Sequence, residues 1–541
     1  MKPPRYNAVM SRRRFLQSGA ALAAAARLPT TLAADTRSSA RPGVLKRLGS
    51  AEPFSYATLK GLARSMAARP YRAPTTQLPE PIANLSWDQW ESIQFREDHS
   101  LWANEGLRFQ ARFFHLGFTV KKPVRLYEVA GGMAQQLAFD PALFDYSRSG
   151  VNWRRLSPEL GFAGFRLLFH TDWQRDIAAF QGASYFRAVD GDMQYGMSQR
   201  GLAIDTGMPQ PEEFPDFIAY YLERPSPDSS ELVVYGLLDS ASTTGAYRFI
   251  MGAGDTLVMD VDAALYPRRV MERVGIAPGT SMFYYDQSQH RLSEDWRPAI
   301  HDSDGLQLYT GVGEWLWRPL MNPGVVRVNS FFDNGPRGFG LMQRDRRFAD
   351  YQDDGVFYNL RPSVWVEPKG NWGRGSVMLV EIPAADETFD NIVAFWNPAT
   401  KPQPGQELLF AYRLSWCRYN PTLCRLAQVY ATREGIGGVV GQKRSYFSWR
   451  FVVDFVGGDF SMLAPGAEVQ AMISASRGQI ELVSARPLLE VHGWRAMFDL
   501  KPTDSSLEPI NLRLFLALGG QPLSETWLYQ YTPPPPAQRG Y

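Results

Sequence analysis

The 541-residue chain is poor in the residues that build metal and disulfide sites. It has two cysteines and six histidines, and no two histidines have the HxxxH or HExxH spacing of zinc ligands. The glycine-rich patterns that hold nucleotide phosphates and the GxSxG pattern of serine hydrolases are also missing. These absences predict neither a bound metal nor a cofactor.

Strong net charge and long apolar runs are missing as well. Residues 1–34 hold six basic side chains and no acid, whereas the whole chain is +2, so the remainder carries about −4. Such a balance provides no basic surface for DNA or RNA. Beyond residue 34 no stretch approaches the ~18 consecutive apolar residues of a membrane span. We therefore expect no nucleic-acid partner and no membrane span.

The start of the chain has the features of an export signal. Residues 11–17, SRRRFLQ, form a twin-arginine pattern, which is followed by a weakly apolar stretch and by Leu-Ala-Ala ending at Ala34. We assign residues 1–34 to a twin-arginine (Tat) signal peptide and expect a periplasmic protein exported by that pathway. The alternative is that these residues form a basic, amphipathic start of the folded domain.

The two cysteines lie close together in the sequence. Cys417 and Cys424 flank the short stretch RYNPTL. An oxidising compartment permits a disulfide across such a loop. Two buried free thiols fit the sequence equally well, so both alternatives stay open.

Short strands dominate the predicted secondary structure. A helical spacing of apolar residues is found before Pro70, and after it no long alternation of strands and helices occurs. Strand-like segments rich in β-branched and aromatic residues alternate with turn sequences. The clearest of them are 232–238, 247–251, 256–261, 326–332, 376–382 and 391–396. The sequence therefore predicts an all-β protein.

Composition suggests where this protein divides. The proline-rich stretch 397–406 is the best candidate for a linker. Beyond it, apolar residues alternate with polar ones, as in half-buried antiparallel strands. We predict a large N-terminal β-sandwich catalytic domain over 50–396, a linker over 397–406, and a smaller immunoglobulin-like β-sandwich over 407–532.

Carboxylates beside aromatic residues are the strongest chemical signal. Asp302 opens the sequence DSDG, and Glu387 and Asp390 precede a strand. Acids in such positions often cap turns, and DSDG also forms part of a calcium loop, although the remaining ligands are missing. Paired carboxylates additionally suit glycoside cleavage, in which one acid protonates the leaving oxygen and another activates water. The aromatic residues near these acids are Tyr358, Trp365, Trp372 and Trp396.

Several longer motifs resemble those of one protein family. The chain is similar to OpgD-type (MdoD-type) members of the OpgG/OpgD family, which are periplasmic proteins of osmoregulated glucan biosynthesis. The twin-arginine pattern favours the OpgD branch. The motifs that carry this resemblance lie at 160–166, 182–189, 200–205, 213–217, 238–242, 245–249, 301–305, 337–341, 351–354, 381–383, 387–391 and 525–531.

The resemblance implies an activity and a set of residues. OpgD-type members are similar to inverting endo-β-1,2-glucanases, so β-1,2-glucan is the expected partner; whether the chain forms a homodimer stays open. The general acid of the family corresponds to Asp390 and the base-side aspartate to Asp302, with Glu387 as a third catalytic candidate. The candidate substrate-binding residues are Tyr185, Tyr358, Trp365 and Trp396.

One segment departs from the hydrolytic relatives. Residues 439–449 are compact where those relatives carry a longer insertion, so hydrolysis and cyclising transglycosylation both remain open. A protein that only binds glucan or serves as a scaffold for its synthesis is the main alternative. A lyase or mutarotase on a similar sandwich fits less well, because no cluster of lysines and histidines is found. For Trp315 and Trp317 we expect a place in the hydrophobic core, on one shared strand face.

Overall fold

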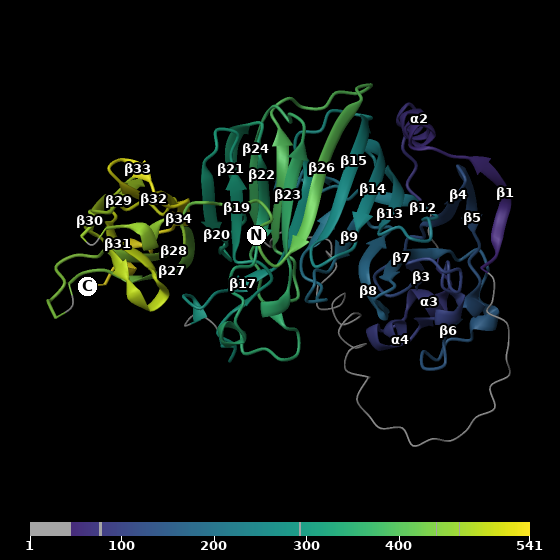
Figure 1. Cartoon of the computed structure of the whole chain (residues 1–541), viewed down its shortest axis with the longest axis horizontal. Helices are drawn as coiled ribbons and strands as arrows, with labels where there is room; N and C mark the ends of the chain where they lie inside the picture. Colours follow the sequence, from purple (N-terminus) through teal and green to yellow (C-terminus); the bar gives the residue numbers. More distant parts are fainter. Residues whose placement is uncertain (1–44, 75–77, 291–293, 440, 465, 541) are drawn as a thin grey trace, which may run out of the picture.

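The computed structural model describes residues 45–74, 78–290, 294–439, 441–464 and 466–540, and it is all-β, as predicted (Figure 1). The predicted signal peptide lies outside these residues. The longest described helix, α2 (Tyr56–Ala67), begins at Ser55, whose side chain accepts the Thr58 amide at 3.2 Å. Within the described residues, no helix is both long and apolar enough to span a membrane.

A sixteen-stranded sheet forms the first layer of the described residues. The predicted strands 232–238, 247–251 and 256–261 are three of its neighbouring strands, β13, β14 and β15. In spatial order, with β33 (Gln521–Pro522) beside β32, the strands are β1 (Arg47–Pro53), β5 (Met133–Leu137), β4 (Arg125–Ala130), β12 (Asp216–Glu223), β13 (Glu231–Asp239), β14 (Thr243–Gly252), β15 (Leu257–Pro267), β26 (Leu408–Cys417), β23 (Ser363–Lys369), β22 (Gly338–Met342), β19 (Gly305–Tyr309), β20 (Trp315–Pro319), β34 (Thr526–Tyr531), β32 (Ile510–Leu518) and β29 (Gln470–Ala475).

A second sheet, of ten strands among the described residues, packs against the first. Phe180 of β8 meets Phe249 of β14 with ring centroids 5.4 Å apart, inside one apolar core shared by the two layers. In spatial order, with β11 (Ala203–Ile204) beside β16, the strands are β21 (Arg327–Asn334), β24 (Arg374–Glu381), β25 (Ile392–Pro398), β16 (Val274–Ser281), β10 (Ser198–Arg200), β9 (Tyr185–Ala188), β8 (Asp172–Gln181), β7 (Phe162–Phe169) and β3 (Phe109–His115).

Short elements complete the large sandwich and position the candidate residues. Two strand pairs, β2 with β6 and β17 with β18, lie outside the two sheets. These short elements are α3 (Glu80–Ala83), α4 (Trp87–Glu91), β2 (Gln94–Phe95), β6 (Phe144–Asp145), β17 (Phe283–Tyr285), β18 (Ile300–His301) and the 3₁₀ turn η6 (Tyr358–Leu360).

The C-terminal strands form a smaller sandwich at one end of the molecule (Figure 1). Its separate sheet contains β27 (Gln428–Ile436), β28 (Trp449–Val456), β31 (Gly493–Lys501) and β30 (Gln479–Leu488). The facing layer is β34, β32 and β29, and the core between the layers includes Phe451, Phe498 and Leu514. This two-layer arrangement agrees with the predicted immunoglobulin-like sandwich.

The predicted boundary at 397–406 is wrong. β26, which follows this stretch, pairs with β15 over nine residues and with β23 over seven, so it is a central strand of the large sheet. The proline-rich stretch carries the chain from β25 in one layer to β26 in the other layer of the same sandwich. Composition revealed a break in strand structure but not that both neighbouring strands share one core. The smaller sandwich begins at β27.

The two sandwiches are joined by a strand pair. β20 runs parallel to β34, with Leu316 opposite Thr526 and Trp317 opposite Trp527. Trp315 and Trp317 are 5% and 4% exposed and pack in the core of the smaller sandwich, which confirms their predicted core position. The structure also decides the cysteine alternative, because Cys417 and Cys424 are both buried free thiols.

Candidate active site

Asp302 lies in a turn directly after β18. Its amide donates to the Met282 carbonyl at 2.9 Å, and the next hydroxyl, that of Ser303, hydrogen-bonds to Ser281. The Asp302 carboxylate forms an ion pair with Arg361, and the two side chains are 0% and 2% exposed. A guanidinium in contact with a buried carboxyl group favours the ionised form of that group. The ion pair with Arg361 therefore fixes the position of Asp302 and favours its charged form.

Arg361 is held in place by the turn η6. In a 3₁₀ turn residues i and i+3 eclipse one another, and the Arg361 guanidinium lies 4.1 Å from the centre of the Tyr358 ring. Its Nε and Nη2 donate to the Val356 carbonyl at 3.2 and 3.1 Å. The turn begins at Phe357, whose φ of 51° is left-handed. The guanidinium is thus fixed on one side by the backbone and directed at Asp302 on the other.

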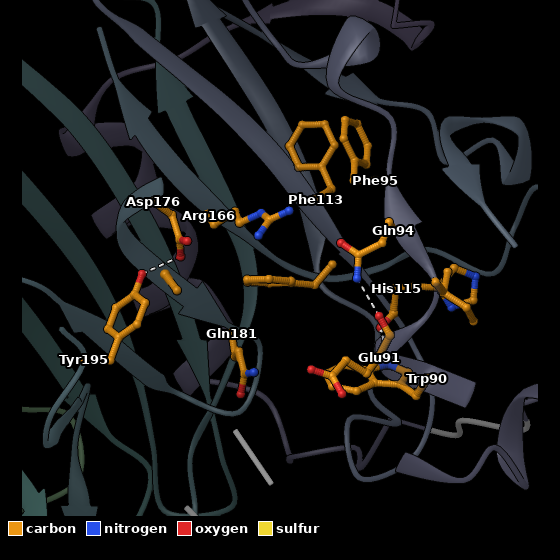
Figure 2. Close-up of a pocket in the computed structure, with 13 residues that line it drawn as sticks. Trp90, Glu91, Gln94, Phe95, Phe113, His115, Arg166, Asp176, Gln181 and Tyr195 are labelled. Atoms are coloured by element: carbon orange, nitrogen blue, oxygen red, sulfur yellow. Dashed lines mark hydrogen bonds between the residues drawn. The ribbon is translucent and has the colours of Figure 1, made fainter. Parts of the chain in front are cut away.

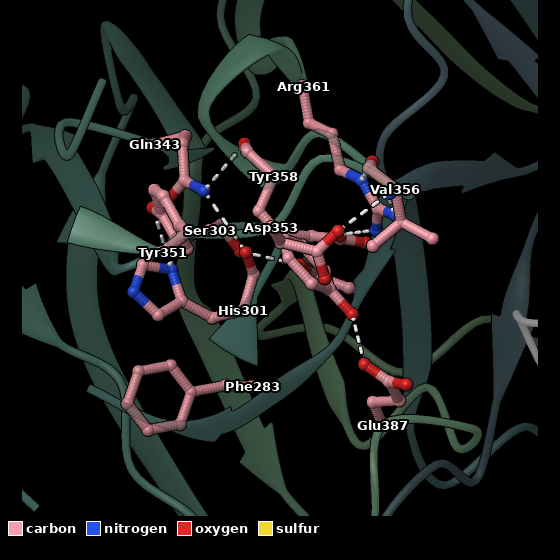
Figure 3. Close-up of polar contacts among 12 residues, drawn as sticks. Phe283, His301, Ser303, Gln343, Tyr351, Asp353, Val356, Tyr358, Arg361 and Glu387 are labelled. Carbon is pink, nitrogen blue, oxygen red and sulfur yellow. Dashed lines mark hydrogen bonds and ion pairs between the residues drawn. The ribbon is translucent and has the colours of Figure 1, made fainter. Parts of the chain in front are cut away.

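His301 and Gln343 connect this turn to the strand that carries Asp302 (Figure 3). The Gln343 side-chain amide donates to the carbonyls of His301 and Tyr358 at 3.1 and 3.3 Å, and its oxygen lies 3.0 Å from His301 Nδ1. Burial lowers the pKa of His301 to about 4, so the ring is neutral at pH 7. His301 therefore contributes hydrogen bonds to this turn and no charge.

Glu387 receives two hydrogen bonds in the same region. The Tyr358 hydroxyl donates to it at 2.6 Å (Figure 3), and Arg297 Nη1 donates to it at 2.8 Å. Arg297 also donates to Asp353 at 2.9 Å. Burial raises the pKa of Tyr358 far above its ordinary value, so its hydroxyl remains a donor. The Glu387 side chain is thereby held in place between a phenol and a guanidinium.

Asp390 is positioned by its neighbour in the sequence. The side chain of the fully buried Asn391 accepts the Phe283 amide at 2.8 Å and donates to the carbonyls of Phe283 and Ile382 at 2.9 and 3.1 Å. These bonds tie the start of β25 to β17 and β24. Asp390, which is 6% exposed, is therefore held at a fixed place at the end of the sheet.

The charge of Asp390 acts on three neighbouring groups. Burial lowers the pKa of Arg187 to about 10, and Asp390 opposes this effect. Burial also raises the pKa of Tyr185 to about 12, with a further contribution from Asp390. The pKa of Arg361 is lowered by burial and raised again by several neighbours, Asp390 among them. Asp390 thus lies within electrostatic range of Tyr185 and Arg187 on β9 and of the arginine that contacts Asp302.

The structure brings most of the predicted site residues together. Asp302, Glu387, Asp390 and Tyr358 contact Arg361 or act on its charge. Tyr185 is related to this group through Asp390, which acts on its pKa. Tyr358 is only 2% exposed, so it takes part through its hydroxyl group and not through an open ring face.

Two predicted binding residues lie elsewhere. Trp365 and Trp396 are both 0% exposed, each inside a hydrophobic core, and Trp365 stacks on Trp315 at 5.8 Å. Neither ring has a face on which a sugar could stack. Both tryptophans lie in strands whose side chains alternate between layers, and the sequence does not say which side of a strand faces the cleft.

The residues that sequence reasoning missed are mainly arginines. Arg361, Arg297 and Arg187 each contact or act on a predicted acid. A signal existed for Arg361, because it follows Tyr358 by three residues, which is the spacing of one 3₁₀ turn. Arg297 and Arg187 come from distant parts of the chain, so only the fold reveals their place.

Comparison with known proteins gives this cluster its context. The family described as "Periplasmic glucan biosynthesis protein, MdoG" matches residues 54–531. The chain belongs to this family. It is 58% identical over 532 residues to glucans biosynthesis protein D of Xanthomonas axonopodis pv. citri (strain 306), which covers 98% of this chain and 99% of that protein. It is 59% identical over 526 residues to the protein of that name from Stenotrophomonas maltophilia (strain R551-3), covering 97% and 98%.

Family membership confirms the resemblance inferred from the motifs. It assigns this chain a role in the biosynthesis of periplasmic glucans and hence a place in the periplasm. The matched residues, 54–531, include both sandwiches and every candidate acid. The site around Arg361 therefore lies within the part of the chain that defines the family.

Proposed function

We propose that this protein cleaves the β-1,2-linked backbone of osmoregulated periplasmic glucans with inversion, by hydrolysis or by transglycosylation. The observation that supports this most is the arrangement around one buried arginine. Arg361 contacts Asp302 directly and lies in the electrostatic field of Asp390 and Glu387. Two carboxyl groups in different surroundings are what acid and base roles require.

In the proposed mechanism, Asp390 donates its proton to the glycosidic oxygen as the bond from that oxygen to the anomeric carbon breaks. The attacking hydroxyl approaches from the opposite face, and its proton passes to Asp302. Arg187 and Arg361 then stabilise the carboxylate left on Asp390. Glu387 and the Tyr358 hydroxyl fix the geometry beside it. Direct attack by water requires carboxyl groups ~6.5–9.5 Å apart.

The attacking hydroxyl comes either from water or from a sugar. We keep transfer as an alternative because segment 439–449 is compact where the resemblance implies a longer insertion in hydrolytic relatives. Asp499 of the smaller sandwich accepts the amide of Gly438, just before this segment, at 2.7 Å and the hydroxyl of Ser448, near its end, at 3.2 Å. Transfer to a hydroxyl of the same chain would close a ring, and inversion at a β-linkage would give an α-linkage.

One incubation tests these alternatives. Purified protein is mixed with linear β-1,2-glucan, and the products are followed by mass, by reducing ends and by NMR of the anomeric protons. Linear products with new reducing ends support hydrolysis. Products without a reducing end that carry one α-linkage support cyclising transfer. Glucan that is bound but unchanged would contradict the enzymatic proposal and favour the scaffold alternative.

We also propose export by the twin-arginine pathway, on the basis of residues 11–17. Replacing Arg12 and Arg13 by lysine should keep the precursor in the cytoplasm, as seen by fractionation and immunoblotting. Normal periplasmic levels of this variant would contradict the assignment.

A further inference from the structure

A small cavity lies on the outer face of the ten-stranded sheet, between α4 and the strands β3, β7 and β8 (Figure 2). Its volume is about 70 Å³. One water needs roughly 10–15 Å³ by this measure, so the cavity is large enough for several waters or for part of one sugar ring. The side chains used below are Trp90, Glu91, Phe113, Arg166, Gln181 and Tyr195.

Several buried polar atoms around this cavity have no partner among the residues that the structure describes. They are Glu91 Oε1, Gln181 Oε1 and Arg166 Nε. The His115 ring packs edge-on against Phe139, Phe144 and Tyr146, none of which lines the cavity, so its nitrogens belong to the neighbouring core. The set contains two acceptors and one donor.

Such a set needs a ligand that both donates and accepts hydrogen bonds. A buried polar group without a partner costs about 1–3 kcal/mol, so the three together favour a ligand that supplies partners for them. Hydroxyl groups have the required chemistry. The formal charges of Arg166, Glu91 and Asp176 do not favour a strongly charged ligand, and Asp176 already accepts the Tyr195 hydroxyl (Figure 2).

Aromatic side chains also line the cavity. Among them are Trp90 and Phe113, and the Trp90 indole is fixed by a 3.0 Å hydrogen bond to the His115 carbonyl. Ligand pockets combine apolar walls with a few convergent polar groups in this way. A sugar ring presents an apolar face of C–H groups and an edge of hydroxyls, and so matches a lining of both kinds.

A row of opposed residues links the cavity to the candidate active site. Arg166 lies opposite Ala179, Ala179 opposite Arg187, and Arg187 is followed across the sheet by Ser198, Thr280 and Val393. Opposed residues point to the same face of a sheet. The row therefore runs along one face, from the cavity towards the strand that begins just after Asp390. Its members beyond Arg166 are buried, with exposed fractions of 0–4%, so the row gives the direction and the distance between the two places and is not an open surface.

Arg187 is the connecting residue within this row. It lies in the field of Asp390, its Nη2 donates to Ser198 at 2.8 Å, and its guanidinium is 5.8 Å from the Tyr195 ring. Tyr195 in turn lines the cavity. Five strand steps separate Arg166 from Val393, or roughly 24 Å at about 4.8 Å per step. This length corresponds to several glucosyl units.

We propose that this cavity is a distal binding site for one glucosyl unit of the glucan whose backbone is cleaved near Asp390. This inference rests on the proposed function. The cavity admits part of one ring, and the row of opposed residues gives the distance that the intervening glucan has to span. A short glucan that occupies the cleavage site cannot reach the cavity, whereas a polymer can.

The test compares ligands of two lengths. Arg166→Met and Glu91→Gln are made in the full mature chain that carries Asp390→Asn, so that the ligand is not consumed. Isothermal titration measures binding of polymeric linear β-1,2-glucan and of the β-1,2-linked disaccharide. The matched control is Arg175→Met, because Arg175 is exposed, lies on β8 and pairs with Asp172 outside the cavity.

We expect each cavity variant to bind the polymer at least tenfold more weakly, while its affinity for the disaccharide changes less than twofold. The control variant should bind both ligands as the parent chain does. Thermal unfolding checks the fold, and Glu91→Gln serves if Arg166→Met does not fold. Unchanged polymer binding in the folded variants, as expected for a cavity that holds only water, would overturn the proposal. An equal loss for both ligands would do the same.

The outcomes also separate the two proposals. If the chain with native Asp390 binds glucan with this length dependence but never cleaves it, the distal site stands and the enzymatic proposal fails. If cleavage occurs and the variants bind normally, only the distal site fails. No binding of either ligand by the parent chain would overturn both.

Discussion

Asp302 and Asp304 are separated by one serine, yet they serve two different regions of the molecule. Asp302 pairs with Arg361 in the candidate active site. Asp304 accepts the backbone amides of Arg344 and Asp345 at 2.8 and 3.0 Å. Burial raises the pKa of Asp304 to about 6. The role of each acid is therefore set by the partner that the fold supplies and not by the residue type.

The region around Asp304 is the junction of the two sandwiches. Arg344 donates to Glu525 at 2.6 Å and to the Val429 carbonyl at 2.9 Å, and it lies 3.5 Å from the centre of the Trp317 ring. Glu525 is 0% exposed and also accepts the Val429 amide at 2.7 Å. The ion pair of Arg344 with Glu525 and the backbone amides held by Asp304 and Glu525 join the two sandwiches, which indicates a structural role.

The largest effect on turnover should come from replacing Asp390, whose charge acts on Arg361, the partner of Asp302. Asp390→Asn removes the proposed proton donor while keeping its shape. Positioned acid catalysis contributes about 10²–10⁴-fold, so turnover of β-1,2-glucan should fall by that factor while glucan binding and the melting temperature stay near native. Turnover close to native would contradict the catalytic role of Asp390. It would also contradict the distinction between the candidate active site and the junction.

Asp302→Asn should affect both activity and stability. It removes the proposed base and leaves Arg361 without its charged partner. Removing one member of a buried ion pair costs about 3–5 kcal/mol. Turnover should therefore be lost, and urea unfolding should show a destabilisation of that order, reduced where the Asn oxygen still accepts a hydrogen bond. Arg361→Met in the same chain should restore part of the stability but none of the turnover; restored turnover would contradict the proposed role of Asp302.

Sequence patterns predicted the strands better than their assembly. The alternation in 408–416 correctly indicates a half-buried strand, but pairing with β15 and β23 depends on residues about 150 and 50 positions earlier. The proline-rich stretch before it looks the same whether it joins two domains or two layers. Local composition contains no information about which partner a strand finds, and so the boundary was misplaced.

The site was predicted in part for a similar reason. The acids Asp302, Glu387 and Asp390 lie in motifs that resemble those of the family, and the structure gathers them. The arginines beside them belong to no local pattern, because each contact spans a large separation in sequence. The sequence shows aromatic rings at Trp365 and Trp396 but not which face of each strand they occupy. Both side chains point into the core.

Tyr358→Phe should sharpen the assignment of the first region with a smaller effect. It removes the hydroxyl that donates to Glu387 at 2.6 Å and keeps the ring under Arg361. A hydrogen bond to a charged group contributes about 1.5–3 kcal/mol, so turnover should fall roughly ten- to a hundredfold if this bond positions Glu387 for the reaction. Tyr430→Phe, at the junction cavity near Asp304, is the matched control and should leave turnover unchanged. Equal effects of the two changes would contradict the separation of the regions.

Asp304 should produce the smallest effect, and its sign is informative. The pKa of Asp304 is about 6 in the folded protein, above its ordinary value of 3.8. Between these values the folded state holds a proton that the unfolded state releases, so this group stabilises the fold as the pH falls from 7 towards 4. The contribution should be on the order of 1–3 kcal/mol, since one pKa unit corresponds to 1.36 kcal/mol.

Asp304→Asn should remove this contribution, so that the difference in unfolding free energy between pH 4.5 and pH 7 changes by that amount relative to the native chain. Urea unfolding at the two pH values measures this difference, with Asp386→Asn, an exposed acid in another turn, as the control. Turnover at pH 7 should change less than threefold, because Asp304 faces the junction. A large loss of turnover without a change in pH dependence would place Asp304 in the active site and remove the distinction from Asp302.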